Sequence, residues 1–152
     1  MAIGDVVLFD QFLVDEAEKL HDLENDDIRL ALITTAVTPL ATAADPRWGA
    51  GGGTNFSTNQ VTPGGNYASG GAAVANPSVA LTGGLAMFDG DNITWAQDAA
   101  NPTNAGWGLL YNNTDAGKRA IGFVDIGGVF DMTSGPLSVN WNAAGIFRKD
   151  QA

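Results

Sequence analysis

Cysteine is absent from this 152-residue sequence, and histidine occurs only once, at His21. Without cysteine the chain has no disulfide framework, no thiolate metal site and no cysteine nucleophile. Lysine and arginine are scarce, with 7 residues against 17 aspartates and glutamates, and the formal net charge is -10 at pH 7. This charge would repel a polyanion such as DNA, and no stripe of basic residues is present to release its counterions. We therefore expect no nucleic-acid partner.

Long apolar runs are lacking as well. Asp5, Asp10 and Asp15 interrupt the apolar stretch near the N-terminus, and no basic region precedes it, so we expect no secretory signal. No window approaches the ~18 to 20 apolar residues that span a bilayer, so we expect a soluble protein without a membrane partner. A chain of this length is typical of one domain with a single hydrophobic core.

The acidic charge is concentrated in the first 27 residues, which carry nine of the 17 acidic residues and one lysine. Apolar residues recur there at steps of three and four, which predicts an amphipathic helix over residues 5–21 with Asp5 as its N-cap. We expect the acids on a solvated face or against a partner, and His21 solvated at the helix C-terminus. The apolar positions of this helix are Phe9, Phe12, Leu13, Ala17 and Leu20.

After residue 27 the pattern becomes that of strands. Residues 28–33 alternate, and further short segments rich in β-branched and aromatic residues follow, separated by turn residues. This spacing predicts a mainly β fold, an antiparallel sandwich or barrel preceded by one short helix. The chain would then divide into an acidic helix and turn over residues 1–27 and a β domain over residues 28–152. The further strands are expected at 73–75, 78–81, 86–88, 92–97, 106–111, 120–125, 136–142 and 145–147, with turns at 82–84, 89–92, 112–117, 127–128 and 134–136.

Residues 45–72 form a long glycine-rich arm within the β domain. The arm has no charged residue after Arg47, and no lysine follows its glycines at 49 and 51 to 53, which excludes a phosphate-binding loop. Interspersed large apolar and aromatic residues favour an ordered segment over a flexible linker. Because a loop of this length in a compact domain is usually functional or disordered, we expect the arm to reach a neighbouring subunit.

No constellation of catalytic residues is found in the sequence. A catalytic triad would require His21, and no Gly-x-Ser-x-Gly motif occurs. Residues 89–92 resemble part of a calcium loop, but Ile93 and Thr94 break the pattern, so we interpret them as a hairpin turn. A depolymerase with two carboxylates in one cleft is the enzymatic alternative. We predict a non-enzymatic protein with no catalytic residue, no cofactor and no metal.

Seven segments between residues 28 and 147 are distinctive in combination: IRLALITTAVTP, ADPRWGAGG, GGNYASGGAAV, FDGDNITWAQ, AGWGLLYNNTDAG, AIGFVDIGG and GPLSVNWNAAGIF. In this order they resemble a family of small tailed-bacteriophage structural proteins that includes capsid cement or decoration proteins. The resemblance implies a jelly-roll-like β-sandwich. It also implies a place on the outer capsid surface of the virion, after assembly in the host cytoplasm. There a homo-oligomer (dimer or trimer) would bridge subunits of the major capsid protein and stabilise the shell.

Similar folds also serve in tail fibres and tail tips, so a receptor-binding tail component is the alternative. In that case Trp48 and Tyr67 would be the first candidates to stack on a sugar. Trp95, Trp107 and Trp141 fall inside strand patterns and are expected in the core, which leaves Trp48 as the exposed aromatic residue.

Candidate partner contacts lie in the acidic helix and in the arm. The helix would choose the partner and its orientation, and we expect the β domain to fold without residues 1–21. The candidates are Phe9, Phe12, Asp15 and Glu16 in the helix, and Trp48, Phe56 and Tyr67 in the arm.

Overall fold

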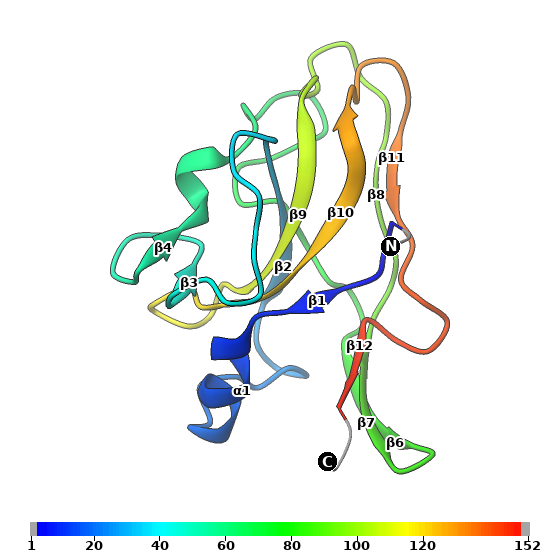
Figure 1. Ribbon diagram of the computed structural model, residues 1–152. Helices are drawn as coiled ribbons and strands as arrows, with labels where there is room; N and C mark the ends of the chain where they lie inside the picture. The colour runs from blue at the N-terminus through cyan, green and yellow to red at the C-terminus, as the bar shows by residue number, and fades with distance from the viewer. Residues whose placement is uncertain (1–2, 150–152) are drawn as a thin grey trace.

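The computed structural model describes residues 3–149 and consists mainly of antiparallel strands with one short α-helix (Figure 1). The mainly β class, consistent with a sandwich, is confirmed, while the jelly-roll connectivity stays a prediction. The elements are β1 (Val7–Leu8), α1 (Asp10–Ala17), β2 (Ile28–Ile33), β3 (Pro46–Arg47), β4 (Thr54–Asn55), the 3₁₀-helix η1 (Phe56–Asn59), β5 (Ala72–Ala73), β6 (Ser78–Thr82), β7 (Leu85–Asp89), β8 (Ile93–Trp95), β9 (Ala105–Asn112), β10 (Ala120–Phe130), β11 (Leu137–Val139) and β12 (Phe147–Lys149).

A five-stranded antiparallel sheet in the order β1-β10-β9-β2-β5 forms the centre of the molecule. In β2, five of the six residues of IRLALI are buried, because both faces of the sheet are covered. Leu30 and Leu32 face one hydrophobic cluster, and Ala31 and Ile33 face another. This burial on both faces differs from the single core-facing side that strict alternation predicts.

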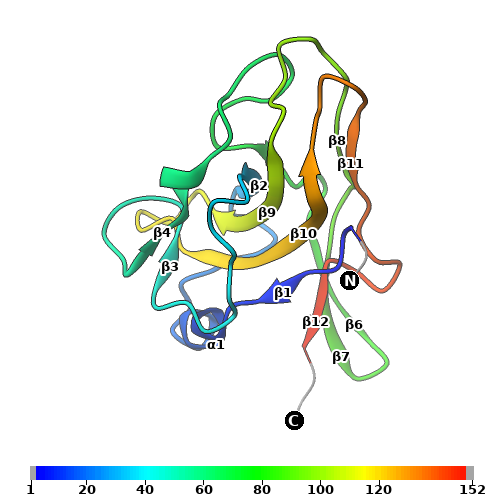
Figure 2. The ribbon, with the colours of Figure 1, turned by 45° about the horizontal axis from the view of Figure 1, so that its top comes forward.

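The first face packs against two smaller antiparallel sheets, β11-β8 and β12-β7-β6. Their buried side chains, among them Phe88, Trp95 and Leu137, share one cluster with Leu30 and Leu110 of the central sheet. In both ribbon views the β8–β11 pair lies on the opposite side of the central sheet from β3 and β4 (Figures 1 and 2). The two facing sets of strands form the sandwich.

The second face is covered by the first part of the glycine-rich arm. The Trp48 ring stacks on the Tyr111 ring at a centroid distance of 5.3 Å, and Phe56 packs on Phe9 at 5.7 Å. Trp48 is only 7% exposed, so the expectation that it is an exposed aromatic is wrong. The arm therefore forms a layer of its own molecule, with β3 and β4 as a short parallel pair.

The rest of the arm also packs on its own sandwich. Tyr67 is buried, and its hydroxyl accepts a hydrogen bond from the Leu32 N–H at 2.9 Å. Gly71 has a φ of 77°, and a Cβ there would overlap the Leu30 carbonyl oxygen. The prediction that the arm extends to a neighbouring subunit is thus wrong, since its glycines allow close approach to the protein's own β2.

The N-terminal segment belongs to the same core. Val7 and Leu8 pair with β10, so the helix begins at Asp10 and not near Asp5, and its N-cap Phe9 makes no side-chain capping bond. Phe9 and Phe12 are fully buried in clusters shared with the sheets. The division at residue 27 and the independent folding of the β domain are therefore not supported, because these residues complete its core.

Two segments predicted as turns between paired strands have a different structure. Residues 89–92 do not close a hairpin, because β7 pairs with β6 and β12 while β8 pairs with β11. The chain instead crosses between sheets there. Gly127 and Gly128 lie inside β10 with φ of 91° and 107°, in a stretch where the register with β9 shifts between Asp125 and Phe130. Positive φ at glycines inside a strand is typical of a bulge.

Neighbouring residues of α1 offer a test of this packing. Phe12 is fully buried and Leu13 is 51% exposed, so Phe12→Ala should lower the free energy of unfolding by ~3–5 kcal/mol and Leu13→Ala by less than ~0.5 kcal/mol. Urea unfolding followed by tryptophan fluorescence measures both. Equal, small losses would mean that α1 is not part of the core.

Candidate functional site

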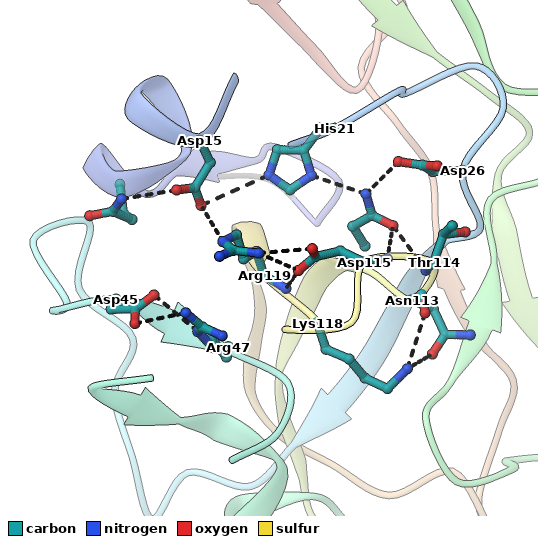
Figure 3. A network of polar contacts seen from close by, with 12 residues as sticks. Asp15, His21, Asp26, Asp45, Arg47, Asn113, Thr114, Asp115, Lys118 and Arg119 are labelled. Atoms are coloured by element: carbon teal, nitrogen blue, oxygen red, sulfur yellow. Dashed lines mark hydrogen bonds and ion pairs between the residues drawn. The ribbon is translucent and has the colours of Figure 1, made fainter. Parts of the chain in front are cut away.

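The acids of the N-terminal segment enter a polar network between α1, the loop that follows it and the β9–β10 turn (Figure 3). Asp15 is buried, at 3% exposed, and accepts a hydrogen bond from Gln11 Nε2 at 2.9 Å. Arg119 Nε lies 3.9 Å from Asp15 Oδ2. The expectation of a solvated or partner-binding acidic face is therefore wrong for Asp15, which has its partners within the chain.

Arg119 joins this helix to the turn. Its Nη1 donates to both carboxylate oxygens of Asp115, at 2.8 and 2.9 Å. The guanidinium thus lies between two carboxylates, one of them buried. A buried charge is tolerated only where opposite charge and hydrogen bonds offset its desolvation. For Asp15, Arg119 supplies the opposite charge and Gln11 supplies the hydrogen bond.

Asn112, at the end of β9, fixes the other half of the network. Its Oδ1 accepts the N–H groups of Thr114 and Asp115, at 3.0 and 3.1 Å, which sets the orientation of the amide. Its Nδ2 then donates to Asp26 Oδ2 at 2.6 Å and lies 3.2 Å from His21 Nδ1. Because the amide nitrogen is a donor, His21 Nδ1 must accept, which places the proton of the neutral ring on Nε2.

His21 is enclosed and not solvated as expected. Its side chain is 0% exposed, its ring packs on Phe12 at a centroid distance of 5.2 Å, and Nε2 lies 4.0 Å from Asp15 Oδ2. No atom of residues 3–149 hydrogen-bonds to Nε2. Burial lowers the pKa of His21, against the opposing effect of Asp15, Asp115 and Asp26. The histidine is therefore held in its neutral form.

A second set of polar contacts closes the β9–β10 turn against β2. Asp27 accepts from Arg29 Nε at 2.7 Å and from Asn113 Nδ2 at 2.8 Å. Burial alone would raise the pKa of Asp27, but these hydrogen bonds lower it. Lys118 Nζ donates to both the carbonyl and side-chain oxygens of Asn113, at 3.0 and 2.8 Å.

The network's contacts are directed at other parts of the same chain. Within residues 3–149, no group of three or more His, Asp or Glu side chains is arranged to hold a metal ion. Charged groups pair with one another, and the amides of Asn112 and Asn113 link the loops. These hydrogen bonds and ion pairs attach α1 and the loop after it to the central sheet.

The predicted contact residues lie mostly inside the protein. The aromatic candidates cannot reach a partner or stack on a sugar, because each is at most 7% exposed. Asp15 is buried, and Glu16 is half-buried and forms an ion pair with Lys149 of β12. As a surface for a partner, the prediction is therefore wrong for the aromatic candidates and for Asp15, whereas for Glu16 it stays a prediction. The buried aromatic members are Phe9, Phe12, Trp48, Phe56 and Tyr67.

Four of the exposed large apolar side chains lie in pairs on two elements, α1 and β6, while Ile3, Leu40 and Val129 are exposed singly elsewhere. Leu13 and Val14 are about half exposed, at 51% and 49%, while Val79 is 43% and Leu81 79% exposed. Beside β6 lies an open cavity of about 510 Å³, which we call the α1–β6 groove. The groove is lined by Glu16, Lys19, His21, Asp22, Leu23, Glu24 and Val79. In the sequence, the alternation of SVALT followed by Gly-Gly signals the hairpin, but it does not show that the hairpin extends beyond the core.

Acidification tests the neutral, buried state of His21. In the unfolded chain the histidine has its ordinary pKa of about 6.5, so the unfolded state takes up a proton before the folded state does as the pH falls. The free energy of unfolding should therefore decrease from about pH 7.5 to about pH 5.5 as the histidine of the unfolded chain takes up its proton. His21→Gln keeps an acceptor for Asn112 and should show a smaller decrease in urea unfolding. The same decrease in both proteins would contradict the assignment.

Known proteins supply no further guide to this site. No helix within residues 3–149 has the length and apolar character needed to cross a membrane. Comparison with protein-family models, with curated proteins and with solved structures gives no match to this chain.

Proposed function

We propose that this protein is a non-enzymatic structural protein of a tailed-bacteriophage virion, a cement or decoration protein on the outside of the head. It would bind subunits of the major capsid protein as a homo-oligomer (dimer or trimer) and stabilise the shell. The observation that carries the proposal is the exposure of Leu13 and Val14 on α1 and of Val79 and Leu81 on β6, on a strongly acidic protein. Exposed apolar side chains grouped on regular elements are typical of protein-binding surfaces.

The resemblance in the sequence also supports the proposal. Three of the segments that carry it, IRLALITT, WGLLYN and GFVDIGG, correspond to β2, β9 and β10, which are neighbours in the central sheet. Part of the similarity therefore lies in the central sheet of the fold, and the other segments extend into its loops. A sheet buried on both faces suits a protein that must stay folded on a particle surface, and the charge of -10 keeps it from packaged DNA.

Purified virions test this function. Quantitative mass spectrometry should find the protein in a copy number comparable with that of the major capsid protein, and cryo-EM should place it at regular positions on the outer shell. Raising the salt concentration should weaken its attachment if the acidic surface meets a basic one. Absence from intact heads would refute the proposal, and a few copies located at the tail would favour the tail-fibre or tail-tip alternative.

A further inference from the structure

Strand β6 is an open edge of the β12-β7-β6 sheet. No strand of the described chain pairs with it on the side away from β7, and all five of its residues are exposed. Figure 1 shows the β6–β7 hairpin projecting at one end of the molecule, next to β12. Sheet edges present rows of unpaired N–H and C=O groups, which proteins usually cover, charge or shorten. This edge carries Leu81 and Val79, so its side chains are not those of a protected edge.

One hydrogen bond shows which backbone groups of β6 point outward. The Val79 N–H donates to Glu24 Oε1 at 2.9 Å, across the α1–β6 groove and away from β7. In an antiparallel ladder, backbone groups of alternate residues point to the same side, so the N–H and C=O of Leu81 also point away from β7. Glu24 thus satisfies the outward N–H at the start of β6, whereas the outward groups of Leu81, near the Gly83-Gly84 turn, pair with no strand of the described chain.

Acidic residues of the α1–β6 groove place negative charge beside this strand edge. Among these residues, Glu16 is paired with Lys149, whereas Asp22 and Glu24 contribute negative charge beside Val79 and Leu23. Lys19 is the one basic residue that lines the groove. A second copy of this chain, added as an antiparallel strand about a two-fold axis, would bring two such acidic grooves together, which like-charge repulsion disfavours. A segment with basic side chains complements the groove.

We propose that β6 binds an extended, lysine- or arginine-bearing segment of a partner protein, which adds as a strand at Leu81 and directs its basic side chains into the α1–β6 groove. Main-chain hydrogen bonds would supply affinity, and the apolar and acidic side chains would supply specificity. That this partner is a capsid subunit rests on the proposed function, whereas the surface itself does not.

A designed peptide tests the surface on the purified full-length protein. The probe is a fluorescently labelled peptide of alternating lysine and valine, and its control alternates glutamate and valine. We expect fluorescence anisotropy to show binding of the lysine peptide only, weakening as salt is raised. Hydrogen exchange should show protection of the Leu81 amide when the peptide is bound.

Four variants, one of them a control, separate the contributions of the backbone N–H, the apolar side chain and the acidic charge to peptide binding. Leu81→Pro removes the outward N–H and should weaken peptide binding about tenfold, since proline is tolerated on an edge strand. Leu81→Lys keeps the backbone but adds a repelling charge and should also weaken binding. Leu40→Lys makes the same change at a loop residue that is 62% exposed and should leave binding unchanged. Glu24→Gln keeps an acceptor for the Val79 N–H and should weaken binding about threefold.

Several outcomes would overturn the inference. Equal binding of both peptides, or equal weakening by Leu81→Lys and Leu40→Lys, would show that the contact is not specific to β6. Protection of the Leu81 amide that rises with protein concentration alone would make a second copy of the chain the occupant. The proposed function fails separately: a protein absent from virions can still bind the lysine peptide at β6, and a protein abundant on heads can fail to bind it.

Discussion

The central sheet is buried on both faces, and the rest of the structure follows from that constraint. One face is covered by β8, β11, β7 and β12, and the other by the arm through Trp48 and Phe56. A chain of this length has few other segments with which to cover a second face. The arm is therefore committed to its own molecule, and the exposed apolar side chains that lie in pairs on regular elements are those of α1 and β6.

The mainly β class and the approximate positions of most strands could be predicted, because alternation and turn residues are local signals. The pairing of strands is not local. The local pattern predicts Val7 and Leu8 as part of a helix, because their partner residues Phe123 and Gly122 lie far later in the sequence. Residues 89–92 have the composition of a hairpin turn, yet nothing in them shows that the next strand joins a different sheet.

The candidate contacts were mispredicted for a related reason. Aromatic residues in a glycine-rich, uncharged segment are expected to be available for binding. The Trp48 ring instead fills the second face, while Tyr67 packs in the cluster of the first face and its hydroxyl bonds to Leu32. Asp15 and His21 lie among acidic residues in the sequence, which predicts that they are solvated. Arg119 and Asn112, which contact them in the structure, come about a hundred residues later. The edge residues Val79 and Leu81 follow an ordinary strand pattern, and only the assembled sheet shows them uncovered.

The pairing of β1 with β10 has a consequence for the time course of folding. Val7 leaves the ribosome before Phe123, so β1 stays without its partner strand until β10 has been synthesised. The acidic residues of the N-terminal segment give it a net negative charge, and like charge disfavours association between such segments in the interval. A fold that pairs strands so distant in the sequence has many non-local contacts, and such contacts slow folding relative to helical proteins of similar length.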